Sequence, residues 1–293
     1  MIRPGAAVGD IRRLSALAAA VLAAVVTGCG GSGDESASSP KRDAEGPVHV
    51  HGLGINPADD SLFIATHTGL FRAAPDKEVS TRVADRYQDT MGFTVVGPDH
   101  FLGSGHPDPR EQLPPLLGLI VSRDGGESWN PVALLGEADF HALESQGRTV
   151  YGYDASGGRF MASRDGGRNW SERAAPEPLV DLAVNPGDRK HVVASGEASI
   201  HVSRDGGRRW RSLAEGAGYL AWPSAKRLYR AAPDGGIHVS SDGGHSWREA
   251  GSIEGQPAAF EAAKPREIYV ALHDGTIQRS ADGGESWAIR SRP

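Results

Sequence analysis

The side chains best suited to chemistry in this sequence are histidines, and most of them stand in its first half. Five of the eleven histidines occupy positions that the fold inferred below brings together: His49, His51, His67, His106 and His141. Imidazole and carboxylate groups bind first-row metals such as zinc and copper, and the thioether of Met91 favours copper. We predict a zinc or copper site on four of these histidines, namely His51, His67, His106 and His141. Two other interpretations stay open: a metal-free ligand pocket, and mutual hydrogen bonding with a structural role only.

Three aspartates fall beside these histidines in the same alignment of repeats: Asp89, Asp139 and Asp154. A glycosidase needs two carboxyl groups about 5–5.5 Å or about 6.5–9.5 Å apart across the glycosidic bond. The three aspartates are therefore candidate catalytic residues for the hydrolysis of a glycan. Glu144 and Glu261 are weaker candidates, because they lie farther along their expected strands.

Five copies of one motif organise most of the chain. Each copy reads Ser-Xaa-Asp-Gly-Gly-Xaa-Xaa-Trp, and the aspartates are 37 to 41 residues apart: Asp124 with Trp129, Asp165 with Trp170, Asp205 with Trp210, Asp242 with Trp247, and Asp282 with Trp287. Asp-Gly between two strand-like runs predicts a hairpin turn, because glycine accepts a positive φ. The serine and aspartate side chains can form hydrogen bonds inside that turn. The tryptophan can bury a large flat surface against its sheet.

This motif resembles the Asp-box, or bacterial neuraminidase repeat. The resemblance implies a β-propeller in which the five aspartates and tryptophans hold the turns. It also implies that these turns lie on the outer rim, far from an active site. The aspartates of the motif are therefore expected to be structural.

A sixth unit precedes the five copies. His51–Arg72 matches the later units as far as the motif, which is degraded there to Ala73-Ala-Pro-Asp76. Residues 47–293 allow about 41 residues for each of six units, enough for four short strands. We predict an all-β fold, a six-bladed β-propeller of four-stranded antiparallel blades with these hairpins, over residues 47–293. The innermost strands are expected to begin near Val48, Thr90, Phe140, Leu179, Gly218 and Ala259.

In a propeller, the first strand of each blade begins, and the second ends, at the same end of the central axis. At the starts of the first strands, the equivalent residues are His51, Met91 and His141. Two positions earlier stand His49, Asp89 and Asp139. At the ends of the second strands, the matching residues are His67, His106, Asp154 and His273. The corresponding positions of units four to six hold Val180, Ala217 and Ala259 instead.

The alignment therefore predicts a polar axial pocket, contributed mainly by blades one to three. Its lining is expected to include His49, His51, His67, Met91, His106, His141 and His273. The loop Gly103–Pro115 is the longest insertion in the repeat, and we expect it to form one wall of the pocket.

The N-terminal sequence predicts that the protein is exported from the cytoplasm. Arg12 and Arg13 precede Leu14–Val26, an apolar run that is too short to cross a bilayer and is typical of a signal peptide. The run ends in Val26-Thr27-Gly28-Cys29, which resembles the bacterial lipobox. That resemblance implies a signal peptide over residues 1–28 and a lipid on Cys29, the single cysteine. The polar residues 29–46 then form a disordered tether.

These features predict a lipoprotein anchored to the outer face of a bacterial membrane. With one cysteine, the chain has no internal disulfide. A net charge of −6 and a pI near 6.0 argue against nucleic acid as a partner. The oligomeric state is not predicted.

Three stretches resemble a family of bacterial secreted lipoproteins described as glycosylhydrolases: His49-Val-His51-Gly-Leu-Gly, Asp89-Thr-Met91-Gly-Phe and Gly103-Ser-Gly-His106-Pro. Sialidases of the Asp-box superfamily clamp a carboxylate with three arginines, and no arginine stands near the start of an innermost strand. A typical sialidase is therefore not expected. We predict an anchored propeller that binds a small ligand, a metal ion or a glycan, in the axial pocket. The alternative is a glycoside hydrolase of the Asp-box superfamily.

Overall fold

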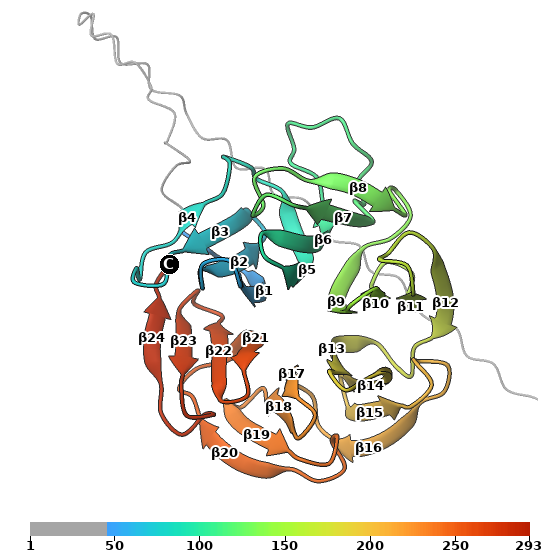
Figure 1. Ribbon diagram of the computed structural model, residues 1–293, viewed down its shortest axis with the longest axis vertical. Helices are drawn as coiled ribbons and strands as arrows, with labels where there is room; N and C mark the ends of the chain where they lie inside the picture. Colours follow the sequence, from blue (N-terminus) through green and yellow to red (C-terminus); the bar gives the residue numbers. More distant parts are fainter. Residues whose placement is uncertain (1–45) are drawn as a thin grey trace, which may run out of the picture. The chain divides into compact units, whose positions relative to one another are not determined.

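The computed structural model describes residues 46–293, and these form a six-bladed β-propeller of four-stranded antiparallel sheets (Figure 1). This confirms the predicted fold class. The predicted signal peptide, Cys29 and nearly all of the predicted tether lie outside the described residues. In the part of the chain that the structure describes, no helix is long and apolar enough to cross a membrane.

Each blade is one continuous segment whose strands follow one another outward from the axis. The first three blades are β1 (Val50–Ile55), β2 (Leu62–Thr66), β3 (Gly69–Ala73) and β4 (Thr81–Arg82); β5 (Asp89–Gly97), β6 (His100–His106), β7 (Leu119–Ser122) and β8 (Asn130–Ala133); and β9 (Phe140–Gln146), β10 (Thr149–Asp154), β11 (Arg159–Ser163) and β12 (Trp170–Ala174).

The other three blades repeat this order. They are β13 (Leu179–Asn185), β14 (Asp188–Gly196), β15 (Ser199–Ser203) and β16 (Arg211–Glu215); β17 (Tyr219–Ser224), β18 (Arg227–Ala231), β19 (Gly236–Ser240) and β20 (Arg248–Ser252); and β21 (Pro257–Lys264), β22 (Glu267–Leu272), β23 (Ile277–Ser280) and β24 (Ala288–Ser291). The innermost strands begin within two residues of the predicted positions.

The five Ser-Xaa-Asp-Gly-Gly turns connect the third and fourth strands of blades two to six. In the turn of blade four, Ser203 Oγ donates to Asp205 Oδ1 (2.9 Å) and accepts a hydrogen bond from Gly207 N (2.7 Å). Asp205 Oδ1 also accepts from the backbone N–H groups of Arg208 and Arg209. The serine is buried, so that these bonds satisfy groups that water does not reach.

The second glycine of each turn contacts the preceding blade. Gly207 lies against Phe160 of β11, and Gly167 lies against Leu119 of β7. Both glycines have positive φ, and an added Cβ would overlap the neighbouring side chain. The turn therefore serves as a spacer between blades as well as a hairpin.

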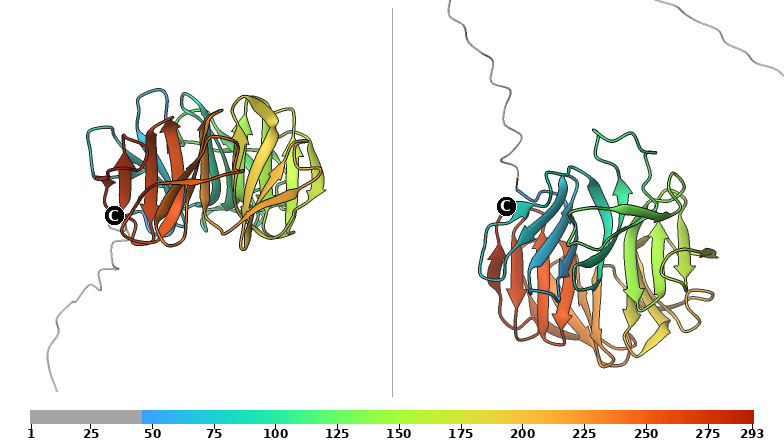
Figure 2. Two further views of the ribbon diagram at one scale, coloured as in Figure 1. Left: turned by 90° about the horizontal axis from the view of Figure 1, so that it is seen from below. Right: turned by 45° about the horizontal axis from the view of Figure 1, so that its top comes forward.

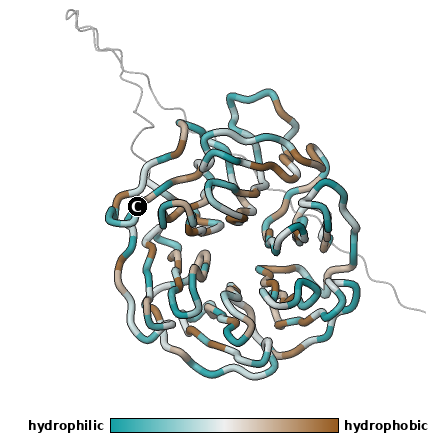
Figure 3. Tube along the Cα trace, viewed as in Figure 1, coloured by the Kyte–Doolittle hydropathy of each residue, from teal (hydrophilic) through white to brown (hydrophobic). Residues whose placement is uncertain are grey.

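The tryptophans of the turns fill the gaps between blades but are only half-buried. Trp170 stacks on Phe140, with ring centroids 4.8 Å apart, and Trp210 meets Phe160 edge-on at 5.1 Å. The core is correspondingly divided into clusters, each shared by two neighbouring sheets, and Figure 3 shows hydrophobic and hydrophilic segments alternating along the blades.

The long connection in blade two differs in extent from the predicted loop. Gly103–His106 belongs to β6, which pairs with β5, so the connection covers residues 107–118. It projects beyond the ring in Figures 1 and 2. Its base is fixed, because buried Asp108 accepts from Tyr87 N (2.9 Å) and pairs with Arg110 (2.6 Å), and Glu111 pairs with Arg86.

The ring closes between blades six and one without sharing a strand. Arg290 donates to the carbonyl oxygens of Ala73 (3.0 Å), Ala74 (2.8 Å) and Lys77 (2.7 Å). Ser291 Oγ donates to Glu78 O at 2.7 Å. A guanidinium with five N–H groups can satisfy several carbonyls at once, and this side chain forms a latch between the two end blades.

We predict that Gly207→Ala lowers the free energy of unfolding by about 2–4 kcal/mol. The substitution combines strain at positive φ with overlap against Phe160. Gly158→Ala is the matched control, because Gly158 also has positive φ but nothing lies within 4 Å of an added Cβ; its expected cost is roughly 1 kcal/mol. Chemical denaturation of both variants measures the difference, and equal costs would contradict the spacer role.

Candidate functional site

One residue near the start of most innermost strands is displaced toward the axis by a β-bulge. The pairing register shifts at His51 in β1, Met91 in β5 and His141 in β9. It shifts at Val180 in β13 and Ala258 in β21 as well. A bulge turns a side chain out of the regular alternation. These residues line one axial cavity together with Tyr219 of β17, and the bulges therefore build the site.

The structure corrects two of the predicted equivalences. Tyr219 and Ala258 take the axial places that the alignment gave to Ala217 and Ala259. In blade five the strand follows Gly216 and Gly218, both at positive φ, and this connection moves the register by two residues. In blade six the bulge moves it by one.

The cavity holds about 290 Å³, at the lower end of the range for small-ligand sites. His49 and His273 complete its lining with the three bulge residues of the first blades, His51, Met91 and His141. Its other walls are the apolar Val50, Val180 and Ala258 with Tyr219, and no arginine lines it. A clamp for an organic carboxylate is therefore absent from this cavity.

Beside the cavity, histidines and aspartates alternate across three blades. His67 Nδ1 lies 2.9 Å from Asp89 Oδ1, and Asp89 Oδ2 lies 3.1 Å from His106 Nδ1. His106 Nε2 is 3.7 Å from Asp139 Oδ2, which is 2.8 Å from His141 Nε2. The structure thus brings together three of the four histidines predicted to bind metal, with Asp89 and Asp139 between them, and the fourth, His51, packs against His67.

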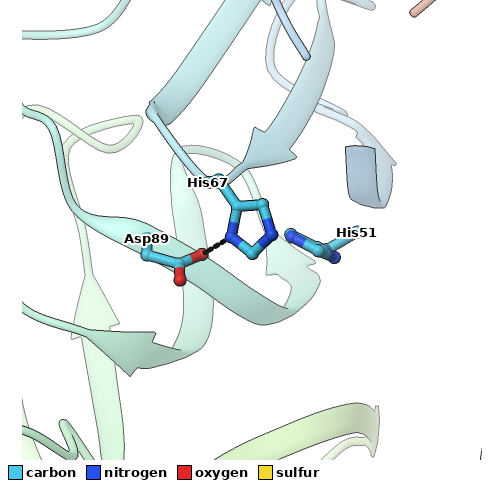
Figure 4. Close-up of side chains that lie close together, drawn as sticks. All are labelled: His51, His67 and Asp89. Atoms are coloured by element: carbon cyan, nitrogen blue, oxygen red, sulfur yellow. Dashed lines mark hydrogen bonds and ion pairs between the residues drawn. The ribbon is translucent and has the colours of Figure 1, made fainter. Parts of the chain in front are cut away.

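Three groups in this region are close enough to share one ion. Ligand atoms of His51, His67 and Asp89 all lie within 4.8 Å of one another (Figure 4). The rings of His51 and His67 meet edge-on, with centroids 4.3 Å apart. In Figure 4 the second ring nitrogen of His67 points toward His51, because Asp89 holds the first. His106 and His141 stay outside this group and are held by the aspartates.

Two polar atoms at the site lack a hydrogen-bond partner within the described residues. They are His51 Nε2 and Asp139 Oδ1, and both are buried. Burial lowers the pKa of His51 to about 4, and the neighbouring His67 adds to this effect. His51 is therefore a neutral imidazole at pH 7, with a lone pair available to a ligand.

Asp154 is placed differently from the other two aspartates. Its carboxylate is fully buried and accepts from Asp139 N (2.9 Å), Ser156 Oγ (2.7 Å) and Arg159 Nε (2.8 Å). These bonds lower its pKa against the effect of burial. Asp154 does not line the axial cavity; it fixes the backbone where β9 begins.

Deeper along the axis lies a second group of acids, of which Asp181 was missed from the sequence. Asp181 of β13 and Glu261 of β21 line a narrow space of about 50 Å³ below His51 and His141. Burial raises the pKa of each to about 7. Burial also raises the pKa of Glu144 well above its usual range, and Glu261 and Asp181 raise it further.

The space between these acids suits a water molecule or two and excludes a sugar ring. Asp181 has a second role, because it accepts from Leu220 N of the next blade at 2.7 Å. The sequence signal that could have identified Asp181 is an acidic residue at a position of a first strand that faces the axis. It was missed because the surrounding Leu179-Val-Asp-Leu-Ala-Val reads as an ordinary buried strand.

The five motif aspartates lie at the other end of the blades from the histidines. The first glycine of the turn in blade three, Gly166, donates to Arg148 O at 2.9 Å, in the connection between β9 and β10. Gly206 donates likewise to Lys190 O, near the start of β14 in blade four. Both acceptors lie close to the ends of the first strands, whereas the histidines of the site stand at the starts of these strands. The aspartates thus hold turns away from the cavity.

No protein-family model and no curated protein matches this chain. Among solved structures, it is similar to three GH74 enzymes: one from Niastella koreensis (13% identity, TM-score 0.57), the xyloglucanase from Xanthomonas campestris (18%, 0.55) and an ancestral enzyme (13%, 0.55). The alignments cover 83%, 83% and 80% of this chain, but 45%, 45% and 36% of those proteins. At these identities the likeness concerns the β-propeller fold, and the chain spans less than half of each enzyme.

We predict that Glu261→Gln stabilises the protein at pH 8 and has little effect at pH 5. At pH 8 the buried carboxylate of the unmodified protein is charged at a cost, whereas at pH 5 it is protonated, because its pKa is about 7. The unfolded chain has an ordinary carboxyl pKa, so the gain at pH 8 is on the order of 2 kcal/mol.

Urea denaturation at the two pH values measures this difference. Glu127→Gln is the control, since Glu127 is exposed, and it should show the same small effect at both pH values. A stabilisation by Glu261→Gln that does not change with pH would contradict the raised pKa.

Proposed function

We propose that this protein binds a transition-metal ion, zinc or copper, through His51, His67 and Asp89 at the edge of the axial cavity. The observation that carries the proposal is the coincidence of three ligand atoms within 4.8 Å with the buried, partnerless nitrogen of His51. A metal ion would satisfy that nitrogen. The bonding of His106 and His141 to the aspartates supports a positioning role for these two histidines.

The arrangement of Asp89 fits this chemistry. Carboxylates that bind a metal are commonly held in place by hydrogen bonds of their own. Asp89 accepts from Nδ1 of both His67 and His106; an ion between Asp89 and His67 would replace the proton that these two share, and His106 would keep holding the carboxylate. The neutral state of His51 removes competition by protons at pH 7. Met91 in the same cavity lining supports copper as an alternative to zinc.

We predict that His67→Ala weakens the binding of Zn²⁺ or Cu²⁺ by 10-fold or more. The variant removes one of the three ligands, and outer-shell losses alone cost about 10–100-fold in known sites. The measurement is titration calorimetry on the purified protein, together with metal analysis after dialysis. His245→Ala is the matched control, because His245 is exposed on a turn at the other end of the blades.

Each result bears on the site. Binding at one equivalent that is lost in His67→Ala and kept in His245→Ala supports it. Equal binding by all three proteins would assign the metal to the surface. Absence of binding by the unmodified protein would leave the metal-free ligand pocket as the interpretation.

The proposal includes export and anchoring. Its support is the signal-like segment ending at Cys29, and we propose a lipid on Cys29 that holds the propeller at the outer face of a bacterial membrane. Cys29→Ser should move the protein from the membrane fraction to the soluble envelope fraction. Retention of Cys29→Ser in membranes would contradict the anchor.

A second candidate function is glycoside hydrolysis, and the GH74 neighbours and the Asp-box resemblance favour it. The catalytic candidates are Asp89, Asp139 and Asp154. Two features weigh against it: Asp154 is enclosed, and the deeper acids have no room for a sugar ring.

A screen with aryl glycosides and xyloglucan tests this candidate function. Turnover that is abolished in Asp139→Asn would establish the hydrolase, because Asp139 is the buried acid beside His106 and His141. We expect no turnover by either protein.

A further inference from the structure

A strongly basic surface lies on the propeller face opposite the histidines, over blades three to five. We call it the basic sector and define it by exposed cations in the turns after the first and third strands and at the start of β14: Arg148, Arg164, Arg168, Arg189, Lys190, Arg204, Arg208, Arg209 and Lys226. The three blades are consecutive in the ring of Figure 1. This concentration stands out in a chain with a net charge of −6.

None of these cations forms an ion pair with a carboxylate of residues 46–293. The same turns hold four aspartates, Asp165, Asp188, Asp205 and Asp242, and each accepts hydrogen bonds within its own turn. Burial lowers the pKa of Arg173, and Arg208 and Arg164 lower it further, while Tyr151 and Asp205 act in the opposite direction. The nine cations of the sector therefore outnumber the four aspartates beside them.

The repeat does not require these charges. The second position of the motif is arginine in blades two to four, but serine in blade five and alanine in blade six. The same face over blades six, one and two mixes exposed acids, including Asp60, Glu78, Glu127 and Glu285, with the cations Lys77, Arg123, Lys264 and Arg266. Lys264 and Arg266 are paired with Glu267 and Glu285. Cations without a carboxylate partner are thus concentrated over blades three to five, as an external anionic partner would require.

We propose that the basic sector rests on the anionic surface of the membrane that carries the lipid anchor, so that the histidine cavity faces away from the bilayer. This inference rests on the proposed anchoring at Cys29. A surface built of turns is suited to a flat partner, and each Lys or Arg near an anionic leaflet contributes favourably until salt screens it.

The lipidated full-length protein in vesicles provides the test. Its only cysteine carries the lipid, so an introduced cysteine is a unique label site. Ala225→Cys places a fluorophore beside Lys226 in the basic sector, and Ala198→Cys places it between β14 and β15, at the histidine end of the blades. Vesicles contain phosphatidylcholine with or without 30% phosphatidylglycerol, and both contain a headgroup-quencher lipid.

We expect quenching at residue 225 to be at least about three-fold stronger than at residue 198 in vesicles with phosphatidylglycerol. The difference should disappear in pure phosphatidylcholine and in 0.5 M salt, because exposed charges are screened. The double variant Arg164→Glu with Arg209→Glu should also abolish it. Lys264→Glu with Arg266→Glu, the same charge change on blade six of the same face, should leave it intact.

Several results would overturn the inference. Equal quenching at the two positions, or the same quenching with and without phosphatidylglycerol, would show that the sector does not contact the anionic surface. Capture by soluble polyphosphate without quenching in vesicles would assign the sector to an acidic polymer. Protein that does not stay with any vesicle would instead show that the anchor is missing, which is a failure of the proposed function. The salt series uses the unmodified charges and stays informative if the double variant unfolds.

Discussion

The contact between each Ser-Xaa-Asp-Gly-Gly turn and the blade before it is the constraint on which this propeller depends. The serine and aspartate close the turn from inside, and the second glycine leaves no side chain to hold the neighbouring blade away. Such turns set the separation between consecutive sheets in blades two to six. The axial cavity, whose residues come from all six first strands, takes its width from that spacing. The positions of the residues that line the axial cavity therefore depend on the spacing that the outer turns impose between blades.

The repeated part of the sequence predicted the fold in detail, whereas the residues that do not repeat predicted only which side chains meet at the site. The motif recurs in five blades, and its recurrence was sufficient to predict the number of blades, their strand content and the place of the turns. Residues that do not recur indicated function, and the convergence of His67, His106 and His141 followed from topology alone. Their pairing through Asp89 and Asp139 required coordinates, because it depends on which ring nitrogen faces which oxygen.

Register was the part that sequence reasoning could not supply. A bulge shifts pairing by one residue and changes which side chain points to the axis. Ala258 was misplaced for this reason, and Tyr219 because the connection through Gly216 and Gly218 moves the register. Asp181 was missed since nothing in a single strand shows that its inward face meets two other acids. The axis thus has two layers, imidazoles above and carboxyl groups of raised pKa below. The wider upper layer is the one with room for a ligand.

The latch between blades six and one has a consequence for how the ring could be rearranged. Every sheet is a single unbroken stretch of chain, and the ring is closed by bonds from Arg290 and Ser291 to backbone oxygens and by one isolated backbone bridge between Val79 and Arg292, without a borrowed strand. Gly46 lies beside Pro293, close enough that a Cβ on this glycine would touch it. A peptide joining these two residues could therefore be short. The chain could then start at any blade without changing which blades are neighbours. A circularly permuted gene that begins at another blade would encode the same six-bladed propeller.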